Sequence, residues 1–471
     1  MEGDSENLRK QIFSIMNWFD FSFCQKFFYK KTELTSSYIF LFAKCLQFIL
    51  QKYDGNIKIV QEYIQSRIKT VLGKAEFSQF TTKKCVKMLK SHILFGNKTD
   101  YRYLIIAEIL FSAAQLGFSV DAAGKQKLQA DLQFSDEQFS KVLSYAQNPF
   151  SVTDGRILKS FSPFLDFVKN SAEYNSLRVV NIGVCATMSA GKSSFVNALL
   201  GYDYLPMRNE ATTARITSVY DNDRAKNLIG FTLKDGNPLD LDCALDSKKI
   251  GEWNASDEVE RIFLQGDLDN IGNKGLIVAV HDTPGTNNSG DERHHKVTMD
   301  FLQKNKMDAI VFVANAEHLC TTDEKALLKE LHEKVIAPQN IPVIFVINKA
   351  DNIDTAKENL DSIFVDYKKF IAEIGFSNAK VFPVSSKAAR LFKIALKNKS
   401  EIFTESECDD FPSIVRKFTK RINLAGARTS DSAEVGEISV DGERYPVADL
   451  QTALLHSGIH IIEKEIESIV R

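Results

Sequence analysis

The sequence predicts an α/β domain, a mostly parallel sheet with helices on both faces, preceded by an all-α N-terminal domain. From residue 176 onward, short apolar runs rich in valine and isoleucine alternate with segments of helical length. This alternation is typical of a parallel sheet that is buried on both faces. Residues 7–147 instead carry apolar residues at helical spacing. We therefore expect an all-helical domain in 1–150, a linking helix in 151–175 and the α/β domain in 176–471.

The strand-like runs of the α/β domain can be placed individually. They are Leu177–Cys185, Leu276–Val280, Ala309–Val313 and Val343–Ile347. Two long stretches lie outside this regular alternation. Residues 222–275 are expected to form an antiparallel extension of the sheet, and residues 396–445, acidic and then polar, are expected to be partly flexible.

Local signals also mark helices in the N-terminal half. The Ser135 hydroxyl can cap a helix whose Gln138, three residues on, completes a capping box. Residues 156–174 carry apolar side chains at helical spacing and are expected to form the linking helix.

Two breaks in the helical half are similar to each other, Lys52–Ile57 and Leu116–Asp121. Each ends an apolar helix and begins a more polar one. This arrangement resembles a TerB-type helical domain, a small bundle of two similar halves, over roughly residues 30–147. The acidic loop positions of that family are matched in part by Asp54 and Asp121, and no metal assignment follows.

Composition is that of an ordinary folded protein. The 471 residues are 44% hydrophobic and 25% charged, which suits two or three domains. The seven cysteines are odd in number and form no CxxC pair, which argues against a disulfide scaffold or a zinc site and favours a reducing compartment. The acidic N-terminus is not a secretion signal. The longest apolar stretch, Ser37–Leu50, is too short and too polar to span a bilayer.

Charge is distributed unevenly along the chain. Basic residues outnumber acidic ones in 1–170, and the reverse holds in the remainder. The basic half could face an anionic membrane surface or an acidic protein partner, although a solvated lysine-rich surface explains it equally well. Nothing has the clustering of a dedicated nucleic-acid binder, and no nucleic acid is expected.

The first strand-like run is followed at once by the loop Ala186–Ser194, Ala-Thr-Met-Ser-Ala-Gly-Lys-Ser-Ser. A tight loop between a strand and a helix points several backbone N–H groups at one anion, which is how phosphates are bound. Lys192 is placed to reach the β- and γ-phosphates of a nucleotide, and the Ser193 hydroxyl to ligate Mg²⁺. Ala186 stands where the GxxxxGK[ST] pattern has glycine, and it strains the loop if that position needs a positive φ.

Two further segments supply groups for the metal and the γ-phosphate. Asp282, in Asp-Thr-Pro-Gly, ends a strand-like run and is expected to hold Mg²⁺ through water. The N–H of Gly285 can turn toward the γ-phosphate. In the segment Ala-Thr-Thr, either Thr212 or Thr213 is expected to close over the metal, and we favour Thr213. The expected metal ligands are Ser193, Thr213 and Asp282.

The segment Asn-Lys-Ala-Asp, residues 348–351, points to the base. The Asp351 carboxylate can accept hydrogen bonds from N1–H and the exocyclic amine of guanine, whereas adenine has no donors there. Lys349 can lay its stem on the base, and the N–H of Ser386 can bond to guanine O6. GTP is therefore expected in preference to ATP.

Together these segments predict a P-loop site for GTP or GDP with Mg²⁺. The expected nucleotide contacts are Met188, Ser189, Ala190, Gly191, Lys192, Ser193, Ser194, Asp282, Gly285, Asn348, Lys349, Asp351, Ser385, Ser386 and Lys387. The residues expected to serve catalysis are Ser189, Lys192, Thr212, Thr213 and Gly285.

The run Met188–Gly201, with Leu205-Pro206 and Ala211–Thr217, resembles bacterial dynamin-like GTPases, including the LeoA-like group. The resemblance spans roughly residues 157–471 and includes Ser457–Ile466, similar to the helix that closes such G domains. It implies weak nucleotide affinity, a homodimer of G domains across the nucleotide, hydrolysis stimulated by that dimer, and membrane remodelling. A cytoplasmic protein, peripheral on the inner face of the membrane, is therefore expected.

The sequence departs from this family in ways that affect hydrolysis. Met188 stands where eukaryotic dynamins carry a glutamine that orients the attacking water, and Thr286 stands where Ras-type GTPases carry theirs. Ser189, a backbone group of Thr212 or Thr213, or a residue from a partner must contribute instead.

Other functions compete with a dynamin-like enzyme. The chain ends at Arg471, whereas dynamin relatives continue into a stalk, so we expect either a fragment or another route to the target. The alternative function is a GTP-dependent switch with negligible hydrolysis whose helical half recruits a partner. An Era-like, ribosome-associated GTPase is disfavoured because no RNA-binding module is visible. The adjacent His294 and His295 point apart on a helix and are not assigned a metal.

Overall fold

The chain divides into two compact units in the computed structural model. The first comprises Met1–Leu177 with Ile229–Phe231 and Asp235–Cys243; the second comprises Arg178–Leu228, Thr232–Lys234 and Ala244–Arg471. The structure describes residues 6–10, 12–14, 16–17, 32–50, 80–90, 92–94, 97–115, 120–147, 166, 170, 173–187, 189–206, 215–223, 225, 228–242, 245–268, 271, 275–285, 292–353, 360–426 and 436–469.

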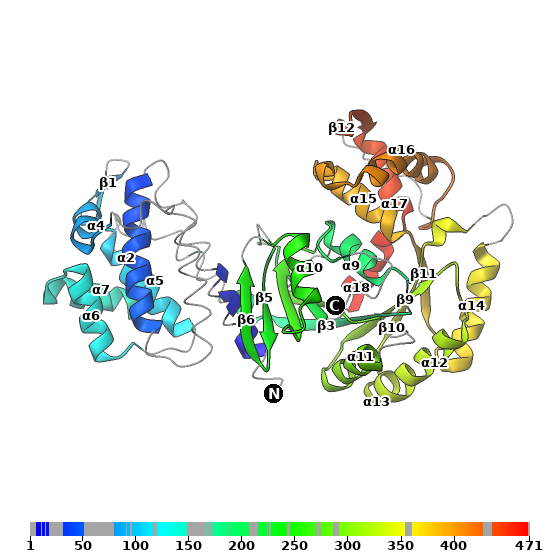
Figure 1. Ribbon diagram of the computed structural model, residues 1–471, viewed down its shortest axis with the longest axis horizontal. Helices are drawn as coiled ribbons and strands as arrows, with labels where there is room; N and C mark the ends of the chain where they lie inside the picture. Colours follow the sequence, from blue (N-terminus) through cyan, green and yellow to red (C-terminus); the bar gives the residue numbers. More distant parts are fainter. Residues whose placement is uncertain are drawn as a thin grey trace. The chain divides into compact units, whose positions relative to one another are not determined.

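The described residues between 6 and 177 are helical apart from one short antiparallel pair (Figure 1). The longer helices of this region are α2 (Thr32–Leu50), α4 (Thr82–Leu89), α5 (Arg102–Gln115), α6 (Ala122–Leu132) and α7 (Asp136–Gln147). The pair consists of β1 (His92–Leu94) and β2 (Asn97–Thr99). Strands of three residues are too short to produce a readable alternation of apolar and polar positions in the sequence.

A buried arginine joins two of these helices. Arg102, at the start of α5, donates from Nη1 to the carbonyl oxygens of Leu132 (2.7 Å) and Gln133 (3.0 Å) at the end of α6. Its Nη2 pairs with Asp100 Oδ2 at 2.8 Å, and its guanidinium lies 4.3 Å from the centre of the Phe134 ring. The last carbonyls of α6 are thereby satisfied, and the buried charge is compensated.

Local capping follows the sequence in this unit. The Ser135 Oγ accepts the N–H of Gln138 at 3.3 Å, and the Ser135 N–H donates to Gln138 Oε1 at 3.2 Å, which confirms the predicted capping box. Asp121 accepts the N–H of Gly124 at 2.7 Å and is the N-cap of α6. The loop containing Asp54 and most of the predicted linking helix in 151–175 lie outside the described residues.

From Arg178 onward the chain forms a nine-stranded sheet, in which the strand order is β11-β10-β9-β3-β8-β4-β7-β5-β6. Five strands from one edge inward are parallel to one another: β11 (Lys380–Val384), β10 (Val343–Asn348), β9 (Ala309–Asn315), β3 (Arg178–Ala186) and β8 (Leu276–Asp282). The four predicted strands are confirmed as β3, β8, β9 and β10. The predicted fold class, a mostly parallel α/β sheet after a helical region, is likewise confirmed.

The other edge of the sheet is mixed in direction. Its strands are β4 (Ile216–Asp221), β5 (Ile229–Lys234), β6 (Asn237–Asp242) and β7 (Arg261–Gly266). β4 runs antiparallel to β8, but β7 runs parallel to β4, so the prediction of an antiparallel extension is wrong for that pair. The two-residue turn Asp235-Gly236, with φ of 50° and 75°, connects β5 to its neighbour β6 and has the conformation typical of a β-hairpin.

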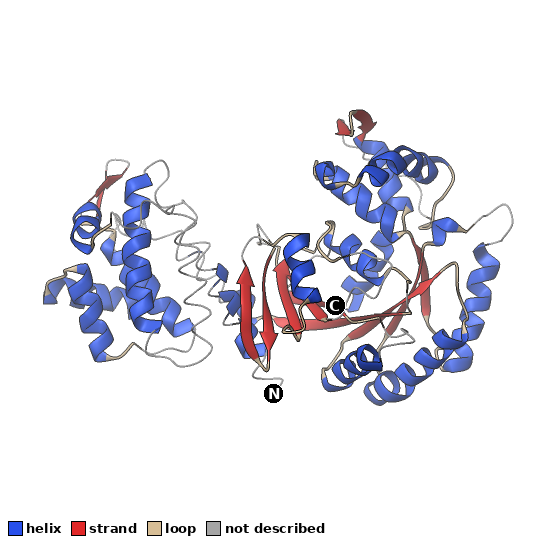
Figure 2. Cartoon of the chain, in the orientation of Figure 1, coloured by secondary structure: helices blue, strands red, loops and turns tan. Residues whose placement is uncertain are grey.

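Helices cover both faces of the sheet (Figures 1 and 2). One face carries α11 (Glu292–Lys304), α12 (Thr322–Leu331) and α14 (Leu360–Ile374), whose apolar residues form one core with β9 and β10. The opposite face carries α9 (Lys192–Leu200), α15 (Ser386–Leu396), α17 (Val447–His456) and α18 (Ile459–Ile469). Shorter elements are α10 (Ser247–Ala255), the π-helix η3 (His332–Ile336), α13 (Ala337–Gln339) and the 3₁₀ turns η4 (Ala350–Asn352) and η5 (Ser400–Ile402).

Much of the polar stretch 396–445 forms regular secondary structure. It contains α16 (Glu405–Lys420) and the antiparallel pair β12 (Glu437–Val440) and β13 (Glu443–Pro446). Phe411, Phe418 and Tyr445 pack into one core with α15 and α17. The helical spacing of the apolar residues in α16 was the signal that its acidic composition obscured.

None of the described helices is long and apolar enough to cross a lipid bilayer.

Candidate nucleotide-binding site

The polar segments singled out in the sequence follow the carboxyl ends of parallel strands. The register pairs Val184 with Asp282 and pairs Asn348 with both Asn315 and Val384. In open α/β sheets, ligands bind in the crevice outside these strand ends. The candidate site therefore lies at this edge of the sheet.

The loop between β3 and α9 has a conformation that requires glycine at one position. Gly191 has a φ of 81°, and a Cβ placed on it would lie 2.5 Å from Asn348 Nδ2. Both the backbone conformation and the close approach exclude a side chain there. Ser189 also has a positive φ, of 58°. Ala186 retains strand backbone as the last residue of β3, so its methyl group causes none of the strain that the sequence suggested.

Three side chains meet where a metal-bound phosphate would lie. Lys192 and Asp282 are only 7% and 1% exposed, and Lys192 Nζ forms an ion pair with Asp282 Oδ1. Ser193 Oγ donates to Asp282 Oδ2 at 3.1 Å. A hydroxyl and a carboxylate are the hard oxygen ligands that Mg²⁺ prefers, so this pair fits the predicted metal.

Buried hydrogen bonds fix the segment 282–285 that follows β8. Thr283 Oγ1 donates to the carbonyl oxygen of Val184 at 2.8 Å. Thr298, on α11, donates to the carbonyl oxygen of Pro284 at 3.1 Å. The backbone leading to Gly285 is thus tied both to β3 and to the helix that follows.

Cys185 lies in β3, just before the loop between β3 and α9. Burial raises the pKa of its thiol to about 12, so the thiol stays neutral.

The side chain of Asn348 connects two loops of the site. It is 2% exposed. Its Nδ2 donates to the carbonyl oxygen of Ala190 at 2.8 Å, and its Oδ1 accepts the N–H of Ser386 at 3.0 Å. Both polar ends of one buried amide are therefore satisfied by backbone groups from segments that are far apart in the chain. The loop carrying Lys192 and the start of α15 are held at fixed positions around it.

The loop after Asn348 is held from two sides. Lys349 has a φ of 60°, and its ammonium lies 3.5 Å from Glu317 Oε2. Asn352 donates to Glu317 Oε1 at 3.0 Å. On the other side, Asp351 Oδ2 lies 3.1 Å from the ammonium of Lys417, on α16. The carboxylate expected to read the base is thus held by a residue that sequence analysis did not identify.

The last predicted segment caps α15. Ser385 Oγ accepts the N–H of Ala388 at 3.5 Å, and the Ser385 N–H donates to the carbonyl oxygen of Ser457 at 2.9 Å. Lys387 pairs with Asp410 on α16 at 2.7 Å. Ser385 and Ser386 are buried, whereas Lys387 is exposed.

Other predicted residues can be placed only in part. Met188, Thr212 and Thr213 lie outside the described residues. Ser189, Ala190 and Ser194 belong to the described loop and the first turn of α9. His295 Nε2 lies 2.8 Å from Glu330 Oε2 on α12, a contact between two helices rather than part of a metal cluster.

Three residues of the site, Glu317, Asp410 and Lys417, were not predicted from the sequence. Glu317 lies two residues after the end of β9, so the strand-end rule could have found it. The residues of α16 follow Asp351 by more than 50 positions and carried no pattern that linked them to it.

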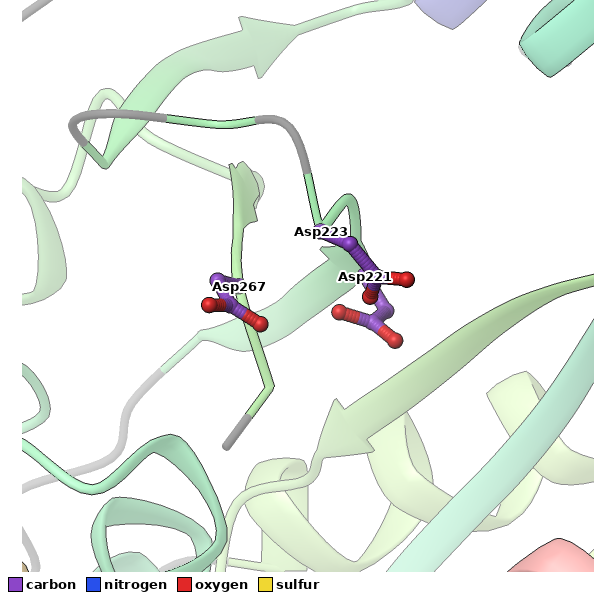
Figure 3. Close-up of side chains that lie close together, drawn as sticks. All are labelled: Asp221, Asp223 and Asp267. Carbon is purple, nitrogen blue, oxygen red and sulfur yellow. The ribbon is translucent and has the colours of Figure 1, made fainter. Parts of the chain in front are cut away.

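A second group of carboxylates lies outside the candidate site. Asp221 is the last residue of β4, and Asp223 and Asp267 follow the ends of β4 and β7. One carboxylate oxygen from each of the three lies within 4.8 Å of the others (Figure 3). Asp221 is buried, and Asp221 Oδ1 accepts the N–H of Leu268 at 2.8 Å. Burial raises the pKa of Asp221 to about 8. Thr217, at the other end of β4, is the residue that pairs with Asp282.

The fold and this strand-end loop are those of the α/β P-loop class. Residues 182–350 match the model of the Dynamin family. The match includes the loop between β3 and α9, Asp282 and Asn348, and it ends one residue before Asp351. The assignment of the base therefore depends on the residues of this chain.

Two curated relatives are similar to parts of the chain. An uncharacterised protein from the xynA 3′ region of Caldicellulosiruptor sp. (strain Rt8B.4) is 29% identical over 259 residues, 54% of this chain and 59% of that protein. A bacterial dynamin-like protein from Nostoc punctiforme is 28% identical over 188 residues, 37% of this chain and 25% of that protein. The chain therefore covers less than two thirds of either relative.

The chain is also similar to parts of solved structures. A chain of an oligomerised bacterial dynamin pair is 17% identical, with 73% of this chain and 57% of that chain covered and a TM-score of 0.37. Era from Aquifex aeolicus, bound to GDP·AlF4⁻, is 20% identical, with 45% and 52% covered and a TM-score of 0.26.

Proposed function

We propose that this protein binds GTP with Mg²⁺ and hydrolyses it to GDP and phosphate as a dynamin-like GTPase. The observation that carries the proposal is the pair of hydrogen bonds made by Asn348. They join the loop that carries Lys192 to the segment that carries Ser386, while Asp351 lies three residues further along. One ligand with phosphates at one end and guanine at the other suits this arrangement.

The phosphate end acts through charge and backbone donors. On GTP binding, the Lys192 ammonium exchanges its contact with Asp282 for the β- and γ-phosphates, and the loop N–H groups bond to the same oxygens. Ser193 and Asp282, together with Thr213, would hold Mg²⁺, which neutralises phosphate charge when bound. The N–H of Gly285 donates to the γ-phosphate.

The base end selects guanine by hydrogen bonding. Asp351 accepts from N1–H and the 2-amino group, Ser386 donates its N–H to O6, and the stem of Lys349 covers the ring. Adenine would leave the Asp351 carboxylate without donors, which is the kind of mismatch that binding sites reject strongly.

Hydrolysis needs an oriented water and stabilisation of the charge on the γ-phosphate. We assign these roles to Ser189, to backbone groups of Thr212 or Thr213, and to a residue from a second G domain. The match to the Dynamin family model in 182–350 and the similarity to the Nostoc dynamin-like protein support a dynamin-like GTPase. We propose that its hydrolysis is coupled to a G-domain homodimer. We extend this to assembly on the inner face of a membrane, with the basic N-terminal region meeting an anionic surface or a protein partner.

Phosphate release from GTP by the purified protein tests the proposal. With Mg²⁺ present, we expect activity per molecule to rise with protein concentration and to be absent with ATP. GTP binding without phosphate release at any protein concentration would instead support the alternative function, a GTP-dependent switch. Capture of a partner protein by the GTP-loaded form but not by the GDP-loaded form would identify such a switch. Failure to bind GTP contradicts both. Co-sedimentation with phosphatidylserine vesicles, with and without GTP, tests the membrane step.

A further inference from the structure

Helix α16 presents one stripe of side chains to the segments that surround the guanine site. Glu407, Asp410, Ile414 and Lys417 are spaced three, four and three residues apart, and therefore share a face. Glu407 forms an ion pair with Arg390 on α15. Asp410 Oδ2 pairs with Lys387 Nζ at 2.7 Å, and Lys417 Nζ pairs with Asp351 Oδ2 at 3.1 Å.

Apolar side chains of α16 next to these charges pack against the loop that carries Ala350 and Asp351. Phe411, Val415 and Phe418 belong to one core cluster together with Ala350. Ala350 is 1% exposed and is the residue directly before Asp351. The loop and α16 therefore pack into the same core. This packing holds the ammonium of Lys417 at a defined position relative to the Asp351 carboxylate.

We infer that Lys417 is a positioning residue for guanine recognition, which acts by fixing the plane of the Asp351 carboxylate. The inference rests on the proposed function. It assigns to α16, outside the region matched by the family model, a part in the choice of base.

The chemistry follows from the acceptor capacity of a carboxylate. The two oxygens offer about four lone pairs in total. Lys417 occupies one on Oδ2, which leaves room for the two donors of guanine. A carboxylate with one oxygen bonded cannot rotate freely about χ2, so both guanine bonds can form together. Without Lys417 the Asp351 carboxylate can rotate, and we expect its hydrogen bond from the 2-amino group of guanine to be lost.

Nucleotides that differ in one donor separate this role from a structural one. Inosine triphosphate keeps N1–H and lacks the 2-amino group. We expect Lys417→Met to weaken GTP binding about tenfold, the value of one charge-assisted hydrogen bond, and to weaken ITP binding much less. The preference for GTP over ITP should then fall. Lys417→Arg should restore most of it, because it retains a cationic donor.

Lys420→Met is the matched control, since Lys420 is an exposed lysine one turn further along α16. Affinities are measured by calorimetry with GDP, GTP and ITP, and folding is monitored by thermal unfolding without nucleotide. The inference is overturned if the Lys417→Met variant has the same nucleotide affinities as this control. It is also overturned if the variant binds GTP and ITP more weakly by the same factor, or if it binds GTP more tightly, which would make the contact inhibitory. Wild-type protein that binds ITP and GTP equally also overturns it, whereas wild type that binds no guanine nucleotide overturns the proposed function itself.

Discussion

The two ends of the candidate site are held in different ways. At the phosphate end, Lys192, Ser193 and Asp282 contact one another at adjacent strand ends, and the charged pair is almost wholly buried. At the base end, Asp351 and Lys349 are held by ion pairs that remain partly exposed, to Lys417 and Glu317. The comparison teaches that adjacent strand ends alone bring the first group together, whereas the position of Asp351 depends on a side chain of α16, a helix distant from it in the chain.

The largest effect is expected at the buried end. Lys192→Ala should abolish GTP binding, with at least a hundredfold loss of affinity, because it removes the charge that faces the phosphates and leaves Asp282 buried without its cation. Calorimetry with GTP and Mg²⁺ measures this. Lys369→Ala, an exposed lysine on α14, is the control. Binding within tenfold of wild type would show that the buried ion pair is structural only.

A change of similar size but different kind is expected at the base end. Asp351→Asn should weaken GTP binding by about a hundredfold and shift preference toward xanthosine triphosphate, because an amide N–H can donate to the 2-oxo group of xanthine. Competition between GTP and XTP for the variant measures the shift. Unaltered guanine preference would remove Asp351 from base recognition.

The connection between the two ends can be broken separately. Asn348→Ala leaves the Ala190 carbonyl and the Ser386 N–H buried without their partner, at about 1–3 kcal/mol for each group. We expect a lower melting temperature and weaker binding of GTP. Asn352→Ala, which loses only the contact with Glu317, should change the melting temperature little. If the two variants lowered the melting temperature equally, the buried hydrogen bonds of Asn348 would contribute no more stability than the surface bond of Asn352.

The smallest effect on binding is expected from Asp221, which belongs to neither end. Its pKa is raised from 3.8 to about 8 in the folded protein, so the folded state binds more protons than the unfolded state between these values. Stability should therefore fall as pH rises from about 4 to about 8, and level off above that. Asp221→Asn should flatten this slope in denaturant titrations, with GTP affinity unchanged. A slope unaffected by the substitution would show that Asp221 ionises normally.

The sequence predicted the parts of the molecule that depend on local pattern. Valine and isoleucine runs located four strands of the parallel sheet, and the capping box at Ser135 was found from two residues. The direction of β7 was not predictable, because strand pairing is decided by partners distant in the chain. Lys417 was missed for the same reason, whereas Glu317 lies two residues after the end of β9 and could have been found from that position. Ala186 was flagged as strained because the pattern records glycine there, but the pattern does not record the φ that this chain adopts.

The amide of Asn348 has a consequence for pieces of the ligand. Because a single buried group bonds to the backbone on both sides, ordering one loop restrains the other. Guanosine and tripolyphosphate, supplied together as separate molecules, would each occupy their half more readily than when supplied alone, and the linked nucleotide would gain from that cooperativity without any additional contact.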